Sequence, residues 1–235
     1  MKSSLGGPFR PVVDKVLSQG VRPLLREHGF VKSGRSFTRR RGPIYDRIHF
    51  QGSSVNSYAP PHRFYVNVDV GSTDIDDAYL GWNNDRRLKT EPILTGRWEQ
   101  FVDGAPDRVE WDLDTDQAAL IEMIRQNVLE ALAVIDPLST TAKLVDWGVA
   151  EGGANHLAKL SAYLVTIGDL DTLTIYISRL YSRWSEDSRW PMFSGFLRGA
   201  IGEAAEPYIA RGLLDDGSGL RPQRSGCLPE CERHW

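Results

Sequence analysis

Hydrophobic residues near the start of the chain recur every three to five positions, the spacing of one face of an amphipathic helix. The pattern spans residues 11–28 and includes Val12, Val13, Val16, Leu17, Val21, Leu24 and Leu25. We expect Gly20 and Pro23 to kink this helix or divide it in two, because proline removes a backbone donor and clashes with the preceding turn. Gly29 is expected at the C′ position after the helix, with Phe30 as its accompanying hydrophobic contact.

The spacing then changes to strict alternation, which is typical of half-buried antiparallel strands. A short strand is expected from Phe37, followed by a turn at Gly42-Pro43. In the next strand the polar positions are Tyr45, Arg47, His49 and Gln51. In the segment 63–70 they are Tyr65, Asn67 and Asp69. Two further strands are expected at 97–102 and 108–113.

From residue 114 onward the spacing is helical. Asp114 or Thr115 is expected to cap a helix that Pro137 ends, because proline cannot continue the hydrogen-bond ladder. The apolar face of that helix comprises Leu120, Ile121, Ile124, Val128, Leu129, Leu132 and Ile135. Three or four more helices are expected, at about 139–149, 154–167, 170–184 and 192–213.

These elements predict an α+β fold in which an antiparallel sheet packs against an N-terminal helix and a helical C-terminal half follows. We divide the chain into a sheet domain with its closing helix (8–136), a helical subdomain (137–214) and a tail (215–235). The tail is rich in Gly, Pro, Ser and charge, so we expect it to be disordered.

The amino-acid composition limits which classes of protein this chain can belong to. Among 235 residues there are seven Trp, eight Tyr and eight Phe, enough to build a sizeable core and to exclude wholesale disorder. The net charge of −3 argues against a constitutive nucleic-acid binder, which usually carries a basic excess. No apolar run is long enough for a membrane span, and no secretory signal is evident, so we expect a cytoplasmic protein. Both Cys lie in the last nine residues, which fits a reducing compartment.

Short motifs in the first half carry a resemblance to a known family. The first helix ends with Leu24, Leu25, Gly29 and Phe30. An arginine-rich strand contains Gly34, Arg35, Phe37, Arg39 and Arg40. Later strands contribute Gln51 and Ser53, then Phe64, Val66 and Asn67, and finally Arg97 and Trp98. In this order the motifs resemble the bacterial family known as domain of unknown function 4304. The family has no established activity, so the resemblance implies a fold; some members lie beside toxin genes, which implies an immunity role as one hypothesis.

The outward face of the sheet is the best candidate site. If the two alternating strands pair in register, cationic, imidazole, amide, phenol and carboxylate groups share one surface, which suits a polar partner. The candidate residues are Arg40, Arg47, His49, Gln51, Tyr65, Asn67 and Asp69. The alternative is that these are simply the polar residues that any antiparallel sheet shows to water.

Charged clusters admit two interpretations each. Arg39, Arg40 and Arg41 could contact phosphate or an acidic partner, or could protect an edge strand from pairing with other chains. The acidic segment 103–116 could attract a basic toxin, or could be a solvated loop that serves the next helix.

We expect no metal site. Asp74, Asp76 and Asp77 lack the Gly and Glu of a calcium loop. Cys227, Cys231 and His234 provide only three zinc ligands.

The sequence favours a non-enzymatic module that binds another protein, with an immunity or antitoxin protein and its toxin as one hypothesis. No catalytic residue and no cofactor is assigned, and the oligomeric state stays open. One alternative is an enzyme in which His49 is a general base oriented by Asp69. The other is a weak nucleic-acid binder that uses Arg39, Arg40 and Arg41.

Overall fold

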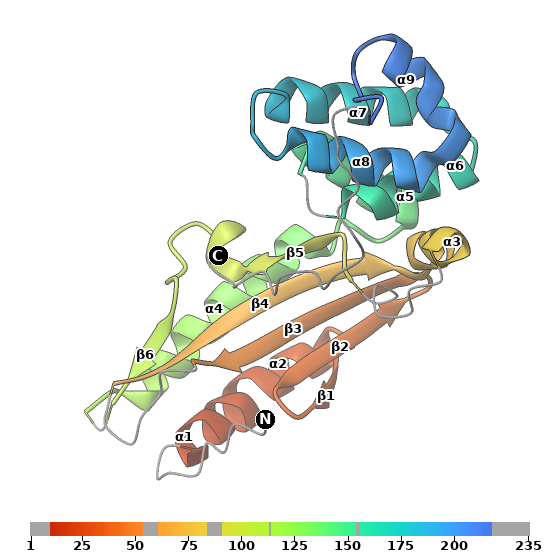
Figure 1. Ribbon diagram of the computed structural model, residues 1–235. Helices are drawn as coiled ribbons and strands as arrows, with labels where there is room; N and C mark the ends of the chain where they lie inside the picture. The colour runs from red at the N-terminus through yellow and green to blue at the C-terminus, as the bar shows by residue number, and fades with distance from the viewer. Residues whose placement is uncertain (1–9, 54–60, 84–90, 113, 154–155, 218–235) are drawn as a thin grey trace.

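The computed structural model describes residues 10–53, 61–83, 91–112, 114–153 and 156–217 (Figure 1). These residues form an antiparallel sheet with helices on one side and a helical C-terminal half beyond one end. The predicted α+β class is therefore confirmed. Within the described ranges, no helix has the length and hydrophobicity needed to span a bilayer.

The sheet has six strands. They are β1 (Val31–Ser33), β2 (Ser36–Arg41), β3 (Ile44–Gly52), β4 (His62–Ser72), β5 (Leu94–Arg97) and β6 (Val109–Trp111). The order is β1-β2-β3-β4-β5, and β6 pairs with the opposite end of β4. Every pairing is antiparallel, and short turns join β1 to β2 and β2 to β3.

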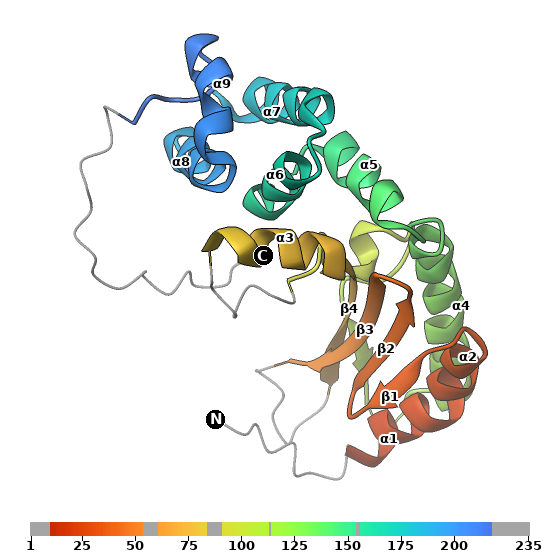
Figure 2. The same cartoon turned by 90° about the vertical axis from the view of Figure 1, so that its right-hand side faces the viewer.

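One face of the sheet is covered by α1 (Arg10–Lys15), the π-helical segment η1 (Val16–Val21), α2 (Arg22–Glu27) and α4 (Gln117–Ile135). Figure 2 shows these helices together on one side of the strands. Alternate strand residues point into this layer, including the fully buried Phe37, Ile48, Phe50 and Val68. Burial of these apolar side chains supplies the main stabilisation of the sheet domain.

The first helical run behaves largely as its sequence predicts. The expected interruption takes the form of a π-helical turn, η1, rather than a break. Gly20 lies in that turn, where there is no room for a side chain, because an added Cβ would come within 2.6 Å of Ile121 on α4. Gly29 ends the run with φ +82°, and the backbone N–H of Phe30 donates to Leu25 O at 2.9 Å. The predicted C′ glycine and its hydrophobic contact are confirmed.

The helical half contains α5 (Thr141–Glu151), α6 (Leu157–Thr166), α7 (Leu170–Trp184), α8 (Trp190–Ile201) and α9 (Glu206–Ala210). Short 3-10 segments, η3 (Trp98–Gln100) and η4 (Gly202–Ala205), complete the described elements. A helix after the central strand, α3 (Thr73–Asn83), packs against α6 and joins the helical half to the sheet domain. The division at residue 137 stays a prediction, and most of the tail lies outside the described residues.

Four details of the secondary-structure prediction were wrong. The strand expected at 97–102 does not form: β5 ends at Arg97, and the 3-10 segment η3 follows. In η3 the Trp98 side chain is fully buried, and its Nε1 donates to Pro106 O at 2.7 Å. Asp116, rather than Asp114 or Thr115, caps α4 by accepting from the backbone of residues 118 and 119. The helix expected at 192–213 is divided at Gly202, whose φ is +57°. The helix α3 was not predicted.

Candidate functional site

Strand register brings the predicted residues together on one face of the sheet. Three pairs lie directly opposite one another on β3 and β4: Arg47 with Asp69, His49 with Asn67, and Gln51 with Tyr65. On β2, Thr38 lies opposite Arg47 and Arg40 lies opposite Tyr45. The expected sharing of one face is confirmed. We call this surface, comprising the outward side chains of β2 to β6, the polar face.

The polar face differs in exposure along its length. Arg40, Arg47 and Gln51 are exposed, whereas His49, Tyr65 and Asn67 are half-buried. The expectation that Asp69 is exposed on this face was wrong: it is buried, with a relative exposure of 3%, because Arg47 and Thr95 bind its two carboxylate oxygens. In Figure 2 the helices α1, α2 and α4 lie on the opposite side of the strands.

Cross-strand contacts fix the side chains of the polar face. Arg47 Nε donates to Asp69 Oδ2 at 2.6 Å, and Thr95 Oγ1 donates to Asp69 Oδ1 at 2.6 Å. Asn67 Nδ2 donates to Gln51 Oε1 at 3.0 Å. The Arg97 guanidinium lies 4.0 Å from the centre of the Tyr65 ring. Such pairs on one face hold side chains in defined positions.

His49 has a different partner from the one expected. Its Nδ1 lies 2.8 Å from Ser36 Oγ, while the described contacts of both Asp69 oxygens go to Arg47 and Thr95. Burial lowers the pKa of His49, and the nearby Arg47 charge lowers it further, so the imidazole is neutral near pH 7. The expected His49–Asp69 pairing is thus absent from the described contacts, since Arg47 occupies the position opposite Asp69.

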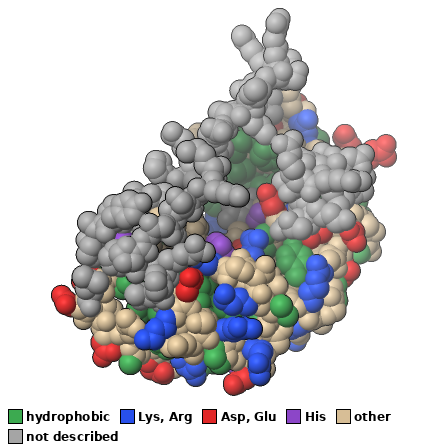
Figure 3. Space-filling view, turned by 90° about the horizontal axis from the view of Figure 1, so that it is seen from below, with side chains coloured by type: hydrophobic (Ala, Val, Ile, Leu, Met, Phe, Trp, Pro, Cys, Tyr) green, Lys and Arg blue, Asp and Glu red, His purple; other side chains and the backbone are tan. Residues whose placement is uncertain are grey.

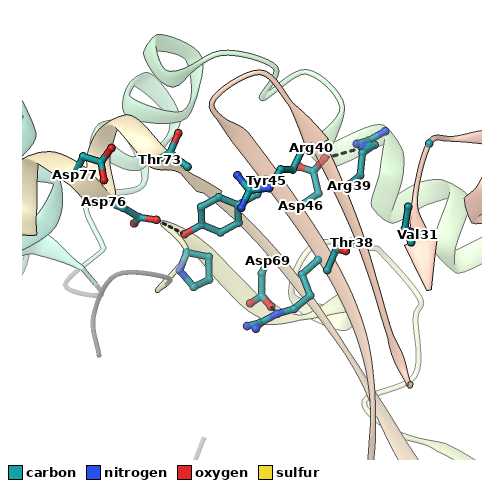
Figure 4. Close-up of a pocket in the computed structure, with 13 residues that line it drawn as sticks. Val31, Thr38, Arg39, Arg40, Tyr45, Asp46, Asp69, Thr73, Asp76 and Asp77 are labelled. Atoms are coloured by element: carbon teal, nitrogen blue, oxygen red, sulfur yellow. Dashed lines mark hydrogen bonds and ion pairs between the residues drawn. The ribbon is translucent and has the colours of Figure 1, made fainter. Parts of the chain in front are cut away.

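A cleft of about 480 Å³ lies where the polar face meets α3 (Figure 4). Its lining includes Thr38, Arg40, Tyr45, Arg47, Asp69, Thr73, Asp76 and Asp77. Tyr45 OH donates to Asp76 Oδ2 at 2.9 Å, and the buried Lys159 of α6 pairs with the other Asp76 oxygen. Burial raises the pKa of Tyr45, and the Asp76 charge raises it further, so the phenol keeps its proton.

Sequence reasoning missed the contribution of α3 to this cleft. Tyr45 alternates with the core residues of its strand, so its outward direction could be foreseen. Thr73, Asp76 and Asp77 could not be placed there, because α3 was not predicted and only the tertiary fold brings it to the sheet.

Comparison with known proteins identifies the family. The family described as Domain of unknown function (DUF4304) matches residues 21–138, half of the chain. The chain belongs to the DUF4304 family. The resemblance found in the motifs is thereby confirmed. The DUF4304 region contains the whole sheet, α3 and α4, whereas α5 to α9 follow it. No curated protein and no solved structure matches the chain.

The arginine cluster of the DUF4304 region is divided between two faces. Arg40 points to the polar face, but Arg39 and Arg41 point to the helical layer. There, Arg39 Nε and Arg41 Nε donate to Asp46 Oδ2 at 2.7 and 2.9 Å. Arg41 also donates to the main-chain oxygen of Asp136 at 2.9 Å. Two of the three arginines therefore close the C-terminal end of α4, a role that neither sequence interpretation anticipated.

The acidic segment 103–116 makes mainly local contacts. Glu110 pairs with Arg63 at 2.6 Å and Arg108 at 2.8 Å, and Asp116 caps α4. Asp112 accepts from Thr115 Oγ1 at 2.8 Å. These contacts agree with the interpretation of a loop that serves the next helix.

The aspartates that were considered as metal ligands make other contacts. Asp74 accepts from Thr141 Oγ1 at 2.6 Å, and Asp76 is paired with Lys159, so both carboxylates join the DUF4304 region to the helical half. No group of His, Cys, Asp and Glu suited to a metal ion occurs among the described residues. Cys227, Cys231 and His234 lie outside them.

Replacing Gly71 by alanine is expected to destabilise the DUF4304 region. Gly71 lies opposite Tyr45, and a Cβ at this position would approach Tyr45 Cζ to 2.2 Å. The ring would have to leave the position from which its hydroxyl reaches Asp76. We expect a loss of about 1–3 kcal/mol in the free energy of unfolding, measured by urea denaturation.

A matched control is Gly199→Ala on the exposed side of α8, where an added Cβ meets no atom within 4 Å. That change should leave stability unchanged or raise it by up to about 1 kcal/mol, because alanine favours a helix. Equal stability of the Gly71→Ala variant and the natural protein would contradict the packing of Tyr45 against Gly71.

Proposed function

We propose that this protein is a bacterial, cytoplasmic, non-enzymatic module that binds another protein through the polar face. An immunity or antitoxin protein that captures its toxin is one form of this function. The observation that carries the proposal is the ordered cross-strand network of exposed and half-buried polar side chains on β3 and β4.

Prior ordering supports binding because it reduces the entropy lost when a partner docks. Arg47 is held by Asp69, Gln51 by Asn67, and the Tyr65 ring lies against Arg97. The same surface combines donors, acceptors and an aromatic ring, the mixture that protein interfaces use. The strands that carry these groups are hydrogen-bonded within a six-stranded sheet, and this favours a defined geometry.

The triple substitution His49→Ala, Gln51→Ala and Asn67→Ala is expected to abolish partner capture. It removes the central polar groups of the face but keeps Arg47, because its loss would leave the buried Asp69 with Thr95 alone. We expect at least tenfold less partner in a pull-down from the native host, with the melting temperature shifted by no more than about 4 °C. The captured protein is then purified, and its affinity is measured by calorimetry.

A matched control is the triple substitution His28→Ala, Gln126→Ala and Glu130→Ala on the helical side. Like the test variant, it removes one half-buried histidine and one exposed hydrogen-bonded pair, here Gln126 to Glu130 at 2.9 Å. It should capture the partner normally. Equal capture by both variants, or no face-dependent partner at all, would contradict the proposed function.

A further inference from the structure

Most charges around the cleft are neutralised within the protein. Asp46 is paired with Arg39 and Arg41, Asp69 with Arg47, and Asp76 with Lys159. Arg40 and Asp77 differ. Asp77 on α3 is exposed at the edge of the cleft with no ion pair among the described contacts, whereas the described contact of the exposed Arg40 is the Tyr45 ring, 5.9 Å from its guanidinium carbon. A cation held over an aromatic ring at the rim of a cleft keeps its hydrogen-bond donors available.

Arg47 offers a second set of donors to the same space. Its Nε is bound by Asp69, and its side chain is 47% exposed, so the terminal nitrogens are not buried by that pairing. Arg40 and Arg47 lie diagonally on neighbouring strands, since Tyr45 and Thr38 occupy the positions opposite them. Diagonal neighbours in a sheet are about 7–8 Å apart, close enough for two guanidinium groups to share one oxyanion.

The surroundings also favour an oxyanion. Thr38 is exposed, opposite Arg47 and two residues before Arg40 on β2, and its hydroxyl can donate a third hydrogen bond. Figure 4 shows Tyr45 between Asp76 and Arg40, with Thr38 and Asp69 bordering the same cleft. Because Tyr45 is anchored on Asp76, the ring below Arg40 is fixed in place.

Charge balance on the polar face points the same way. Its strands carry Arg40, Arg47, Arg63 and Arg97 against Asp69 and Glu110, although the whole chain has a net charge of −3. Seen from below, Lys and Arg side chains lie across the lower half of the view, with Asp and Glu among and around them (Figure 3). A local positive excess attracts an acidic surface.

We propose that Arg40 and Arg47 form a two-arginine clamp in the cleft, which binds a carboxylate of an acidic segment on the partner protein. This inference rests on the proposed function and names the chemistry of the partner. Guanidinium groups bind carboxylates through paired, charge-assisted hydrogen bonds, so the clamp supplies specificity as well as attraction. A nucleic acid fits less well, because Arg39 and Arg41 are bound by Asp46 and do not extend the clamp into the longer row of cations that a phosphate backbone needs.

A fluorescently labelled hexaglutamate peptide tests the clamp directly. Anisotropy at low salt should show saturable binding to the natural protein, weakened at least tenfold by Arg40→Glu. Arg47→Lys should weaken it several-fold, because lysine lacks the planar fork. The control Arg26→Glu, an exposed arginine on α2, makes the same charge change away from the cleft and should alter binding less than twofold.

Three results would overturn the clamp. They are no binding of hexaglutamate, equal weakening by Arg40→Glu and Arg26→Glu, or displacement of the peptide by inorganic phosphate or single-stranded DNA at lower concentration than by free hexaglutamate. The last result would assign the cleft to a phosphate-bearing ligand.

The clamp and the proposed function can fail separately. The pull-down variant described above leaves Arg40 and Arg47 intact. A captured partner that depends on His49, Gln51 and Asn67 but binds the Arg40→Glu variant normally would disprove the clamp and leave the binding face standing.

Discussion

Replacing Asp46 by asparagine is expected to lower the free energy of unfolding by about 3–5 kcal/mol. The Asp46 side chain is fully buried and accepts from Arg39 and Arg41, whose side chains are only 9% and 20% exposed. Asparagine keeps the shape but removes the charge, which leaves two largely buried guanidinium groups without their common carboxylate. Urea denaturation followed by circular dichroism measures the loss.

The effect should extend to the end of α4. Arg41 donates to the main-chain oxygens of Ile135, Asp136 and Leu138 at 2.9–3.2 Å. The last carbonyls of a helix have no partner within the helix, so these contacts complete its hydrogen bonding. Amide hydrogen exchange in the last turn of α4 should therefore accelerate more than exchange in its first turn.

Asp136→Asn is the matched control for this network. Asp136 pairs with Arg39 at 2.6 Å, but the Asp136 side chain is 43% exposed, so water can solvate the site when the charge is removed. We expect a cost below about 1 kcal/mol. Similar losses in the Asp46 and Asp136 variants would contradict the distinction between a buried and an exposed partner.

The alternation of β3 and β4 was sufficient to predict the polar face from the sequence. Each core residue, such as Ile48 or Val68, fixes the direction of its neighbours, because successive strand residues point to opposite sides. A one-residue shift would have moved Phe50 and Val66 into water, so burial defines the register. Arg47, His49 and Asn67 consequently lie where the pattern predicts.

The same pattern could not reveal which polar side chains bind one another. Asp69 was expected to orient His49, but Arg47 occupies the opposite position and takes its carboxylate. From the sequence alone, Arg39 and Arg41 look like surface residues, because only the tertiary fold places the end of α4 beside them. Such partners come from distant parts of the chain, and local periodicity contains no information about them.

The contact between α3 and α6 shows the same limit at the scale of the whole fold. Asp74, Asp76 and Asp77 were considered in the sequence only as cation ligands, yet Asp74 and Asp76 are the points at which the helical half is bound. Thr141, at the start of α5, donates to Asp74 and lies 2.8 Å from Ser72 Oγ. Buried polar groups of this kind require partners, so they define how two layers dock.

Replacing Lys159 by methionine is therefore expected to weaken the docking of the helical half by about 3–5 kcal/mol. Lys159 and Asp76 are 2% and 4% exposed, and they pair across the contact between α6 and α3. Methionine fills a similar volume without charge, so the buried Asp76 would keep only the Tyr45 hydroxyl as its described partner. Chemical denaturation measures the loss in overall stability.

The double variant Asp76→Asn with Lys159→Met separates the ion pair from the packing around it. Removing both charges leaves no uncompensated ion, and asparagine can still accept from Tyr45, so stability should recover by at least about 2 kcal/mol relative to Lys159→Met. If the two substitutions were simply additive, the charges would not be coupled, and packing of apolar residues alone would hold α6 against α3. Recovery in the double variant would instead show that the cost of Lys159→Met comes from leaving the Asp76 charge buried without its partner at the contact between α3 and α6.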